Sequence, residues 1–81
     1  MAHWNYRIIL HDRAPEEDRY YGLHKVHYEG DRIVSWAENA TSFTCDHDEA
    51  AQGLIRLLEM ALADVRSRPV LIESEISATP A

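Results

Sequence analysis

Residues 46–66 read DHDEAAQGLIRLLEMALADVR, and this stretch predicts one long amphipathic helix. Asp46 is followed three residues later by Glu49, and this spacing predicts the start of a helix. The Asp46 side chain accepts hydrogen bonds from amides of the first turn, and the Glu49 side chain reaches back to the amide of the capping residue. Apolar residues then recur at helical spacing and form one stripe. The stripe consists of Ala51, Ile55, Leu58, Leu62 and Val65, widened by Leu54 and Ala61. We expect this stripe, with Leu58 at its centre, to be buried against the remaining residues.

Three segments before the helix predict the strands of a sheet that would cover it. Residues 4–11 alternate, so that one face carries Trp4, Tyr6, Ile8 and Leu10. Residues 20–28 are rich in aromatic and β-branched side chains, and a tight turn at Gly30 leads into a returning strand over 33–37. In that strand we expect Val34 and Trp36 on one face and Ile33 on the other. Residues 41–45 predict a short fourth strand or an extension of the third.

The expected fold class is therefore α+β, with an antiparallel three- to four-stranded sheet packed on one C-terminal amphipathic helix. The helix should end near Ser67, because Pro69 disfavours helical backbone in the residue before it. We assign residues 1–72 to a single α+β domain. Residues 73–81 are small or polar apart from Ile76, and they predict a disordered C-terminal tail.

The second face of the predicted sheet needs a cover of its own. Ile9 points away from the helix, and Leu23 and Val26 cannot share a face in a regular strand, so either a bulge intervenes or both faces are partly covered. A second copy of the chain is one cover, and residues 70–72 folding back is the other. We favour the homodimer, because the core of so short a chain is small. The candidate interaction surface comprises Ile9, Leu23 and His27.

Composition narrows the classes of partner. The chain has 81 residues, enough for one domain, and 14 acidic against 8 basic residues give a net charge of −6. This acidic balance repels phosphate backbones and anionic lipids, so we expect no binding to nucleic acid or membranes. The lone Cys45 rules out an internal disulfide. No segment is typical of a signal peptide or a membrane span, which predicts a cytoplasmic protein.

The titratable residues do not form a recognisable catalytic or metal motif. Of the five histidines, His24 and His27 are closest in sequence, yet positions three apart on a strand face opposite sides. Cys45 is more typical of a small buried side chain than of a nucleophile. The many aromatic residues favour core packing over a base-stacking platform, because a basic groove is missing. We therefore expect no catalytic residues, no metal ligands, no cofactor and no enzymatic activity.

Five short motifs carry a resemblance that covers nearly the whole chain. They are Asn5-Tyr6-Arg7-Ile8, Tyr21-Gly22-Leu23-His24, Trp36-Ala37-Glu38, the Leu-rich helix over 54–65, and Pro69-Val70-Leu71. In these motifs the sequence resembles a family of short uncharacterised bacterial proteins. The resemblance implies a fold and no particular activity.

A looser likeness concerns the layout of the elements. Strands followed by an acid-capped, Leu-rich helix are similar to the N-terminal domain of HicB-like antitoxins, which neutralise a small RNA-cleaving toxin. The sequence departs from that pattern because it lacks a Gly-rich strand turn and a Pro-Gly-Cys segment. The residues after Pro69 are also too few for the DNA-binding domain that such antitoxins carry. This likeness is one of fold, and fold alone does not fix function.

The function that these observations favour is a small, non-enzymatic protein-interaction module, which associates with another protein or with itself. Toxin neutralisation of the HicB-like type is one form that this function would take. The alternative is a small-ligand or metal-binding domain that uses the histidines.

Overall fold

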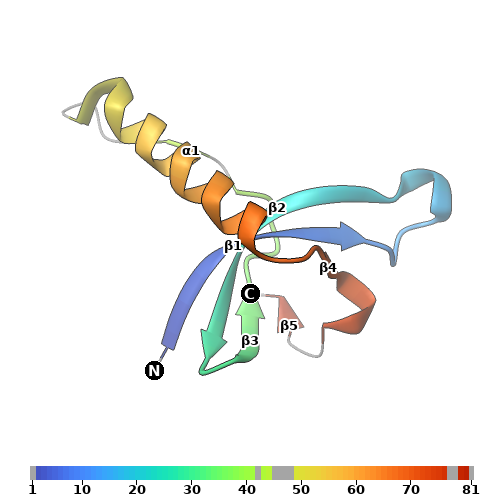
Figure 1. Ribbon diagram of the computed structural model, residues 1–81. Helices are drawn as coiled ribbons and strands as arrows, with labels where there is room; N and C mark the ends of the chain where they lie inside the picture. The colour runs from blue at the N-terminus through green and yellow to red at the C-terminus, as the bar shows by residue number, and fades with distance from the viewer. Residues whose placement is uncertain (1, 42, 45–48, 77–78, 81) are drawn as a thin grey trace.

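The fold is described by a computed structural model that places residues 2–41, 43–44, 49–76 and 79–80. Its elements, in chain order, are β1 (Ala2–His11), the 3-10 turn η1 (Glu16–Asp18), β2 (Tyr20–Glu29), β3 (Arg32–Trp36), α1 (Ala50–Ser67), β4 (Leu71–Ile72), the 3-10 turn η3 (Glu73–Glu75) and β5 (Thr79–Pro80). All strands belong to one sheet with the order β4-β1-β2-β3-β5 (Figure 1). One sheet and one helix confirm the α+β class.

The three N-terminal strands form the antiparallel part of the sheet. β1 pairs with β2 along its whole length, and the β2–β3 hairpin turns at Gly30, whose φ of 62° suits glycine. The β2–β3 pairing shifts register between His27 and Tyr28. Because of this irregularity, Ile33 packs against the core that contains Trp36. The prediction that these two side chains lie on opposite faces is therefore wrong.

Residues 71–76 and 79–80, which we call the C-terminal strap, supply both outer strands of the sheet. β4 pairs in parallel with β1 at one edge, and β5 pairs in parallel with β3 at the other. The strap crosses from edge to edge with η3 between its two strands, so the sheet curls (Figure 1). The docking of residues 70–72 on the sheet, one of the two covers considered above, is thus present in the monomer.

The predicted boundary of a disordered tail at residue 73 is wrong for residues 73–76. The amide of Ser74 donates to the Asp12 carboxylate at 3.0 Å, and Ile76 packs against the core. One apolar side chain and a few polar contacts are enough to hold this segment, although its composition is mostly polar. Residues 77–78 and 81 lie outside the described part of the chain.

The core lies on the concave side of the sheet. Its buried members are Ile9, Val26, Tyr28 and Trp36, and Ile33, Leu71 and Ile76 pack against them. Ile9 is 0% exposed, because the strap covers it. Ile9 is therefore unavailable to a partner in the folded monomer, which corrects its place in the candidate interaction surface.

Helix α1 lies on the other side of the sheet, against β1. The Asp64 carboxylate accepts from the backbone N–H of Tyr6 at 3.0 Å, and so satisfies an amide on the edge of β1 that β4 does not reach. Burial and the nearby Asp64 charge raise the pKa of the Tyr6 hydroxyl. The C-terminal half of α1 lies over the strands, whereas its N-terminal half extends beyond them (Figure 1). The helix is thus anchored near one end.

The face that α1 buries differs from the predicted stripe. The buried helix residues are Gly53, which lies outside the predicted stripe and has no side chain, and Ala61, which the stripe includes. Ile55, Leu58 and Leu62 remain 44%, 47% and 49% exposed. At 3.6 residues per turn, the buried side is rotated from the stripe by roughly a third of a turn. The prediction that Leu58 lies at the centre of the core is wrong.

The entry to α1 also departs from expectation. The helix begins at Ala50, and the preceding Glu49 makes no side-chain capping hydrogen bond. The predicted cap Asp46 and the neighbouring Cys45 lie outside the described residues. In the described part of segment 41–45, no residue is in a strand, although the amide of Thr41 donates to the carbonyl of Leu23 at 2.7 Å.

Deleting residues 73–81 is expected to lower the free energy of unfolding by at least about 2 kcal/mol, because Ile76 leaves the core and the polar contacts of η3 are lost. Urea denaturation followed by circular dichroism measures the change. Val70→Ala is the matched control, since Val70 is 46% exposed and should matter by less than about 0.5 kcal/mol. An unchanged midpoint after the deletion would place the ordered boundary back at residue 72.

Candidate functional site

An open apolar groove, here called the α1 groove, separates the helix from the outer face of the sheet. Its volume is about 450 Å³. The side chains that line it are Ile8, Leu23, Phe43, Leu58, Ala61, Leu62 and Val65. Every lining side chain is apolar, and the groove is open to solvent. Contiguous apolar surface of this kind is typical of protein interaction sites.

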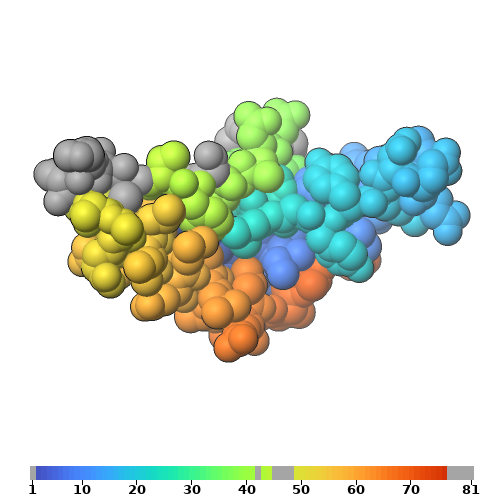
Figure 2. Space-filling model, turned by 90° about the horizontal axis from the view of Figure 1, so that it is seen from above, coloured from blue at the N-terminus to red at the C-terminus, as the bar shows by residue number. Residues whose placement is uncertain are grey.

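The exposed residues of α1 extend this apolar surface along the helix. Ile55, Leu58 and Leu62 are each almost half exposed, at spacings of three and four residues. We call these three residues the α1 seam. A spacing of this kind is the a and d pattern through which helices pair in coiled coils. Figure 2, seen from above, shows α1 in yellow and orange on the surface beside the strands.

The structure separates the three residues predicted to form the interaction surface. Leu23 lines the α1 groove as the cross-strand neighbour of Ile8, and the exposed His27 lies further along the same face of β2, opposite Trp4. Ile9 is buried on the other face. The sequence pattern predicts the three seam residues as one stripe in the core, whereas the structure exposes them.

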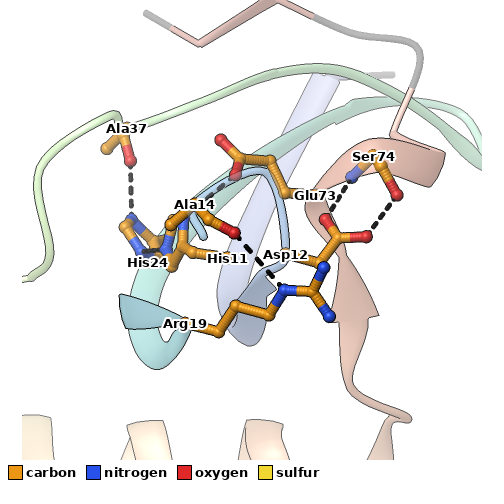
Figure 3. A network of polar contacts seen from close by, with 8 residues as sticks. All are labelled: His11, Asp12, Ala14, Arg19, His24, Ala37, Glu73 and Ser74. Carbon is orange, nitrogen blue, oxygen red and sulfur yellow. Dashed lines mark hydrogen bonds and ion pairs between the residues drawn. The ribbon is translucent and has the colours of Figure 1, made fainter. Parts of the chain in front are cut away.

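A second cluster lies on the concave side, where two histidines from neighbouring strands meet. The Nε2 atoms of His11 and His24 are 2.8 Å apart, and the two residues are 5% and 1% exposed. His24 Nδ1 lies 2.8 Å from the carbonyl oxygen of Ala37, and His11 Nδ1 lies 3.5 Å from a carboxylate oxygen of Glu73. Figure 3 shows this row of groups, which runs from Ala37 through both rings to η3.

The hydrogen-bond partners fix which nitrogen atoms carry hydrogen. A carbonyl oxygen only accepts, so His24 donates from Nδ1 to Ala37 and, when neutral, offers its Nε2 lone pair. His11 must therefore donate from Nε2 to His24. When His11 also carries hydrogen on Nδ1, it forms an ion pair with Glu73. Burial is the main cause that lowers the pKa of His24, and the hydrogen bond to Ala37 opposes it.

Aromatic rings and one glycine shape the surroundings of the pair. Tyr20 stacks on His11 with ring centroids 4.3 Å apart, and Trp36 meets His24 edge-on at 5.4 Å. Gly22 lies against the two imidazoles: a Cβ there would be 2.6 Å from Nε2 of His24 and 3.2 Å from Nε2 of His11. The pair therefore requires glycine at this position.

The geometry of the pair is that of a hydrogen bond. The ring centroids are 4.8 Å apart, so the two Nε2 atoms point nearly at each other. Two nitrogen ligands of a tetrahedral metal, each bonded at 2.0–2.1 Å, would be about 3.3 Å apart. Among the described residues, no group of three or more His, Cys, Asp and Glu side chains is placed to hold a metal ion. His24 is buried and His27 is exposed on the opposite face, so these two do not meet.

Comparison with known proteins returned no relatives: no family model matches the chain, and searches of curated proteins and of solved structures found no match. Within the described residues, no helix is long and apolar enough to cross a membrane. The case for a function therefore rests on the α1 seam, the α1 groove and the histidine cluster.

Proposed function

We propose that the protein is a protein-interaction module that forms a homodimer through the α1 seam and the α1 groove beside it. The observation that carries this proposal is the exposure of Ile55, Leu58 and Leu62 on a helix whose neighbouring flank, with Ala61, rests on the sheet. Burial of these side chains against a partner surface would add hydrophobic stabilisation that the monomer lacks.

The repeat on α1 favours a second copy of the same helix as the partner. From Ala51 to Val65 the apolar positions follow spacings of four, three, four and three residues, which is a strict heptad pattern. Such a seam is complementary to itself, and a two-fold contact buries it on both copies at once. Glu59 and Arg66 lie beside the seam and carry opposite charges. Two copies of the helix therefore do not meet with charges of one sign only.

The proposed contact lies on the opposite side of the molecule from the one expected from the sequence. That expectation placed the dimer on the sheet face with Ile9, but the C-terminal strap covers this face. Leu23 stays in the proposed interface, because it lines the α1 groove. His27 lies on the same outer face of β2.

Sedimentation equilibrium of the wild-type protein at about 10–100 µM tests the dimer, because a dimer with a dissociation constant of about 1 µM is largely assembled in this range. We expect a mass of two chains for the wild type. Leu58→Glu should give a mass of one chain with an unchanged far-UV circular dichroism spectrum, since Leu58 is largely outside the core.

The matched control is Ala63→Glu, which adds the same charge on the exposed side of α1 away from the seam. This variant should remain a dimer. A mass of one chain for the wild type throughout the concentration range would rule out self-association. Equal dissociation by both variants would place the contact elsewhere.

A second candidate is the toxin-neutralising role implied by the likeness to HicB-like antitoxins. The net charge of −6 favours it, because an acidic protein attracts a basic, RNA-binding partner. In this case wild-type protein should suppress RNA cleavage by a toxin of the type that HicB-like antitoxins bind. Leu58→Glu should lose this effect, whereas Ala63→Glu should keep it.

A further inference from the structure

The C-terminal strap is fastened to the end of β1 by two neighbouring polar contacts. Glu73 faces the imidazole of His11 at 3.5 Å, and Ser74 donates to the carboxylate of Asp12 from both its amide and its hydroxyl. Figure 3 shows these groups side by side. Glu73 belongs to the histidine cluster, so the state of that cluster bears directly on how the strap is held.

The cluster has room for only one hydrogen between its rings. His24 already donates from Nδ1 to Ala37, so a further proton on His24 must go to Nε2. That atom lies 2.8 Å from Nε2 of His11, which carries hydrogen whenever His11 is charged and paired with Glu73. A neutral His11 instead moves its hydrogen to Nδ1 and accepts from His24, so the conflict arises when both rings are charged. Two N–H groups cannot face each other at this distance. The rings must then separate, and His11 leaves its position opposite Glu73.

We propose that the cluster of His11, His24 and Glu73 is a pH-operated latch, in which protonation of His24 beside a charged His11 releases the C-terminal strap from the sheet. The inference goes beyond self-association, because the latch lies on the concave side of the sheet and α1 lies on the other.

The groups that face the cluster come from every element packed around it. They are Arg7, the cross-strand partner of His24 on β1; Tyr20 on β2; Trp36 and the Ala37 carbonyl at the end of β3; and Glu73 on η3. Burial, together with the charge of His11, outweighs the backbone contacts to Ala37 and Asn39 and the charge of Glu73, so the pKa of His24 is lower than the ordinary 6.5. The neutral form is therefore the one that the folded state prefers.

The direction of the pH dependence follows from this preference. Below pH 6.5 the unfolded or released chain binds the His24 proton more readily than the latched form does. The stability of the latched form is complete above pH 6.5, declines as the pH falls, and stops declining below the pKa of the latched state. The Asp12–Ser74 contact responds in a separate range, because the hydrogen bond from Ser74 lowers the pKa of Asp12 below 3.8.

Amide hydrogen exchange of the full chain from about pH 8 to pH 5, the range in which histidine titrates, tests the latch. After correction for intrinsic exchange, protection of the Ser74 and Ile76 amides should fall by up to about tenfold per pH unit below 6.5. Amides in α1 and in the β1–β2 pairing should keep their protection over the same range. Protection of the strap that does not change with pH, or that falls together with α1, would overturn the proposal.

Three variants distinguish the residue whose protonation releases the strap, His24, from the residue that holds the strap, Glu73. His24→Asn keeps a donor for Ala37 but cannot titrate, so the pH step should disappear. His27→Asn, on the exposed outer face, should leave the step unchanged. Glu73→Gln, which removes the partner of the charged His11, should weaken strap protection while the step remains. If His24→Asn does not fold, ring NMR of wild-type His24 decides: release that does not follow its titration would overturn the latch.

Discussion

Replacing Ile9 with alanine is expected to lower the free energy of unfolding by about 2–5 kcal/mol. Ile9 is fully buried in the concave core, whose other members come from β2, β3 and the C-terminal strap. Truncation of Ile9 leaves a cavity between the sheet and the C-terminal strap, and the surrounding side chains fill it only in part. For a domain of this size the loss is a large share of the total stability. Urea denaturation followed by circular dichroism measures it.

Val34→Ala is the matched control for this prediction. It also shortens an aliphatic side chain on a strand, but Val34 is 41% exposed at the irregular pairing of β3. Its effect should be less than about 1 kcal/mol. Equal losses for Ile9→Ala and Val34→Ala would mean that the core is not on the concave side.

Gly22→Ala is expected to lower the free energy of unfolding by about 1–3 kcal/mol, as overpacking of a filled core does. The added Cβ would lie 2.6 Å from Nε2 of His24, where no atom fits without movement of the ring. The hydrogen bond between His11 and His24 should be lost at the same time. Thermal denaturation gives the stability change, and histidine ring NMR reports the lost contact.

A double-mutant cycle shows whether the ring of His24 is the cause. Truncation of that ring in His24→Ala makes room for the new methyl group, so Gly22→Ala should cost less in this background than in the wild type. Strictly additive losses would contradict the steric explanation. Gly30→Ala is a useful contrast, because its Cβ would meet nothing within 4 Å and its cost would come only from a φ of 62°.

The strands and turn of the N-terminal half could be predicted because their signals are local. Alternation over residues 4–11 and the glycine at position 30 specify a strand and a tight turn with no information about distant residues. The buried side of α1 could not be predicted in this way. Gly53 is buried and Asp64 accepts from an edge amide of β1, and hydrophobicity selects neither of them. Hydrophobicity does select Ile55, Leu58 and Leu62, which are exposed.

The histidine cluster was missed because it depends on strand register. His11 and His24 meet only when residues 12–19 join β1 to β2 so that His11 pairs with Tyr20. A shift of one residue would turn one ring to the other face. The signal that points to this register is Gly22, whose missing side chain leaves space for both rings. The position of Glu73 beside His11 could not be predicted either, because it depends on the C-terminal strap. The polar composition of that segment gives no sign that it is ordered.

The long reach of the strap also has a consequence for how the protein is made. Leu71 pairs with Ile9, and Ser74 binds Asp12 across a separation of 62 residues. During synthesis the hairpin strands therefore leave the ribosome well before the segment that covers their apolar face. Contacts between residues so far apart in sequence also form slowly, because a long loop must close first. Throughout that interval the face with Ile9 and Val26 is open to other chains, so a chaperone that shields nascent hydrophobic strands should raise the yield of folded protein.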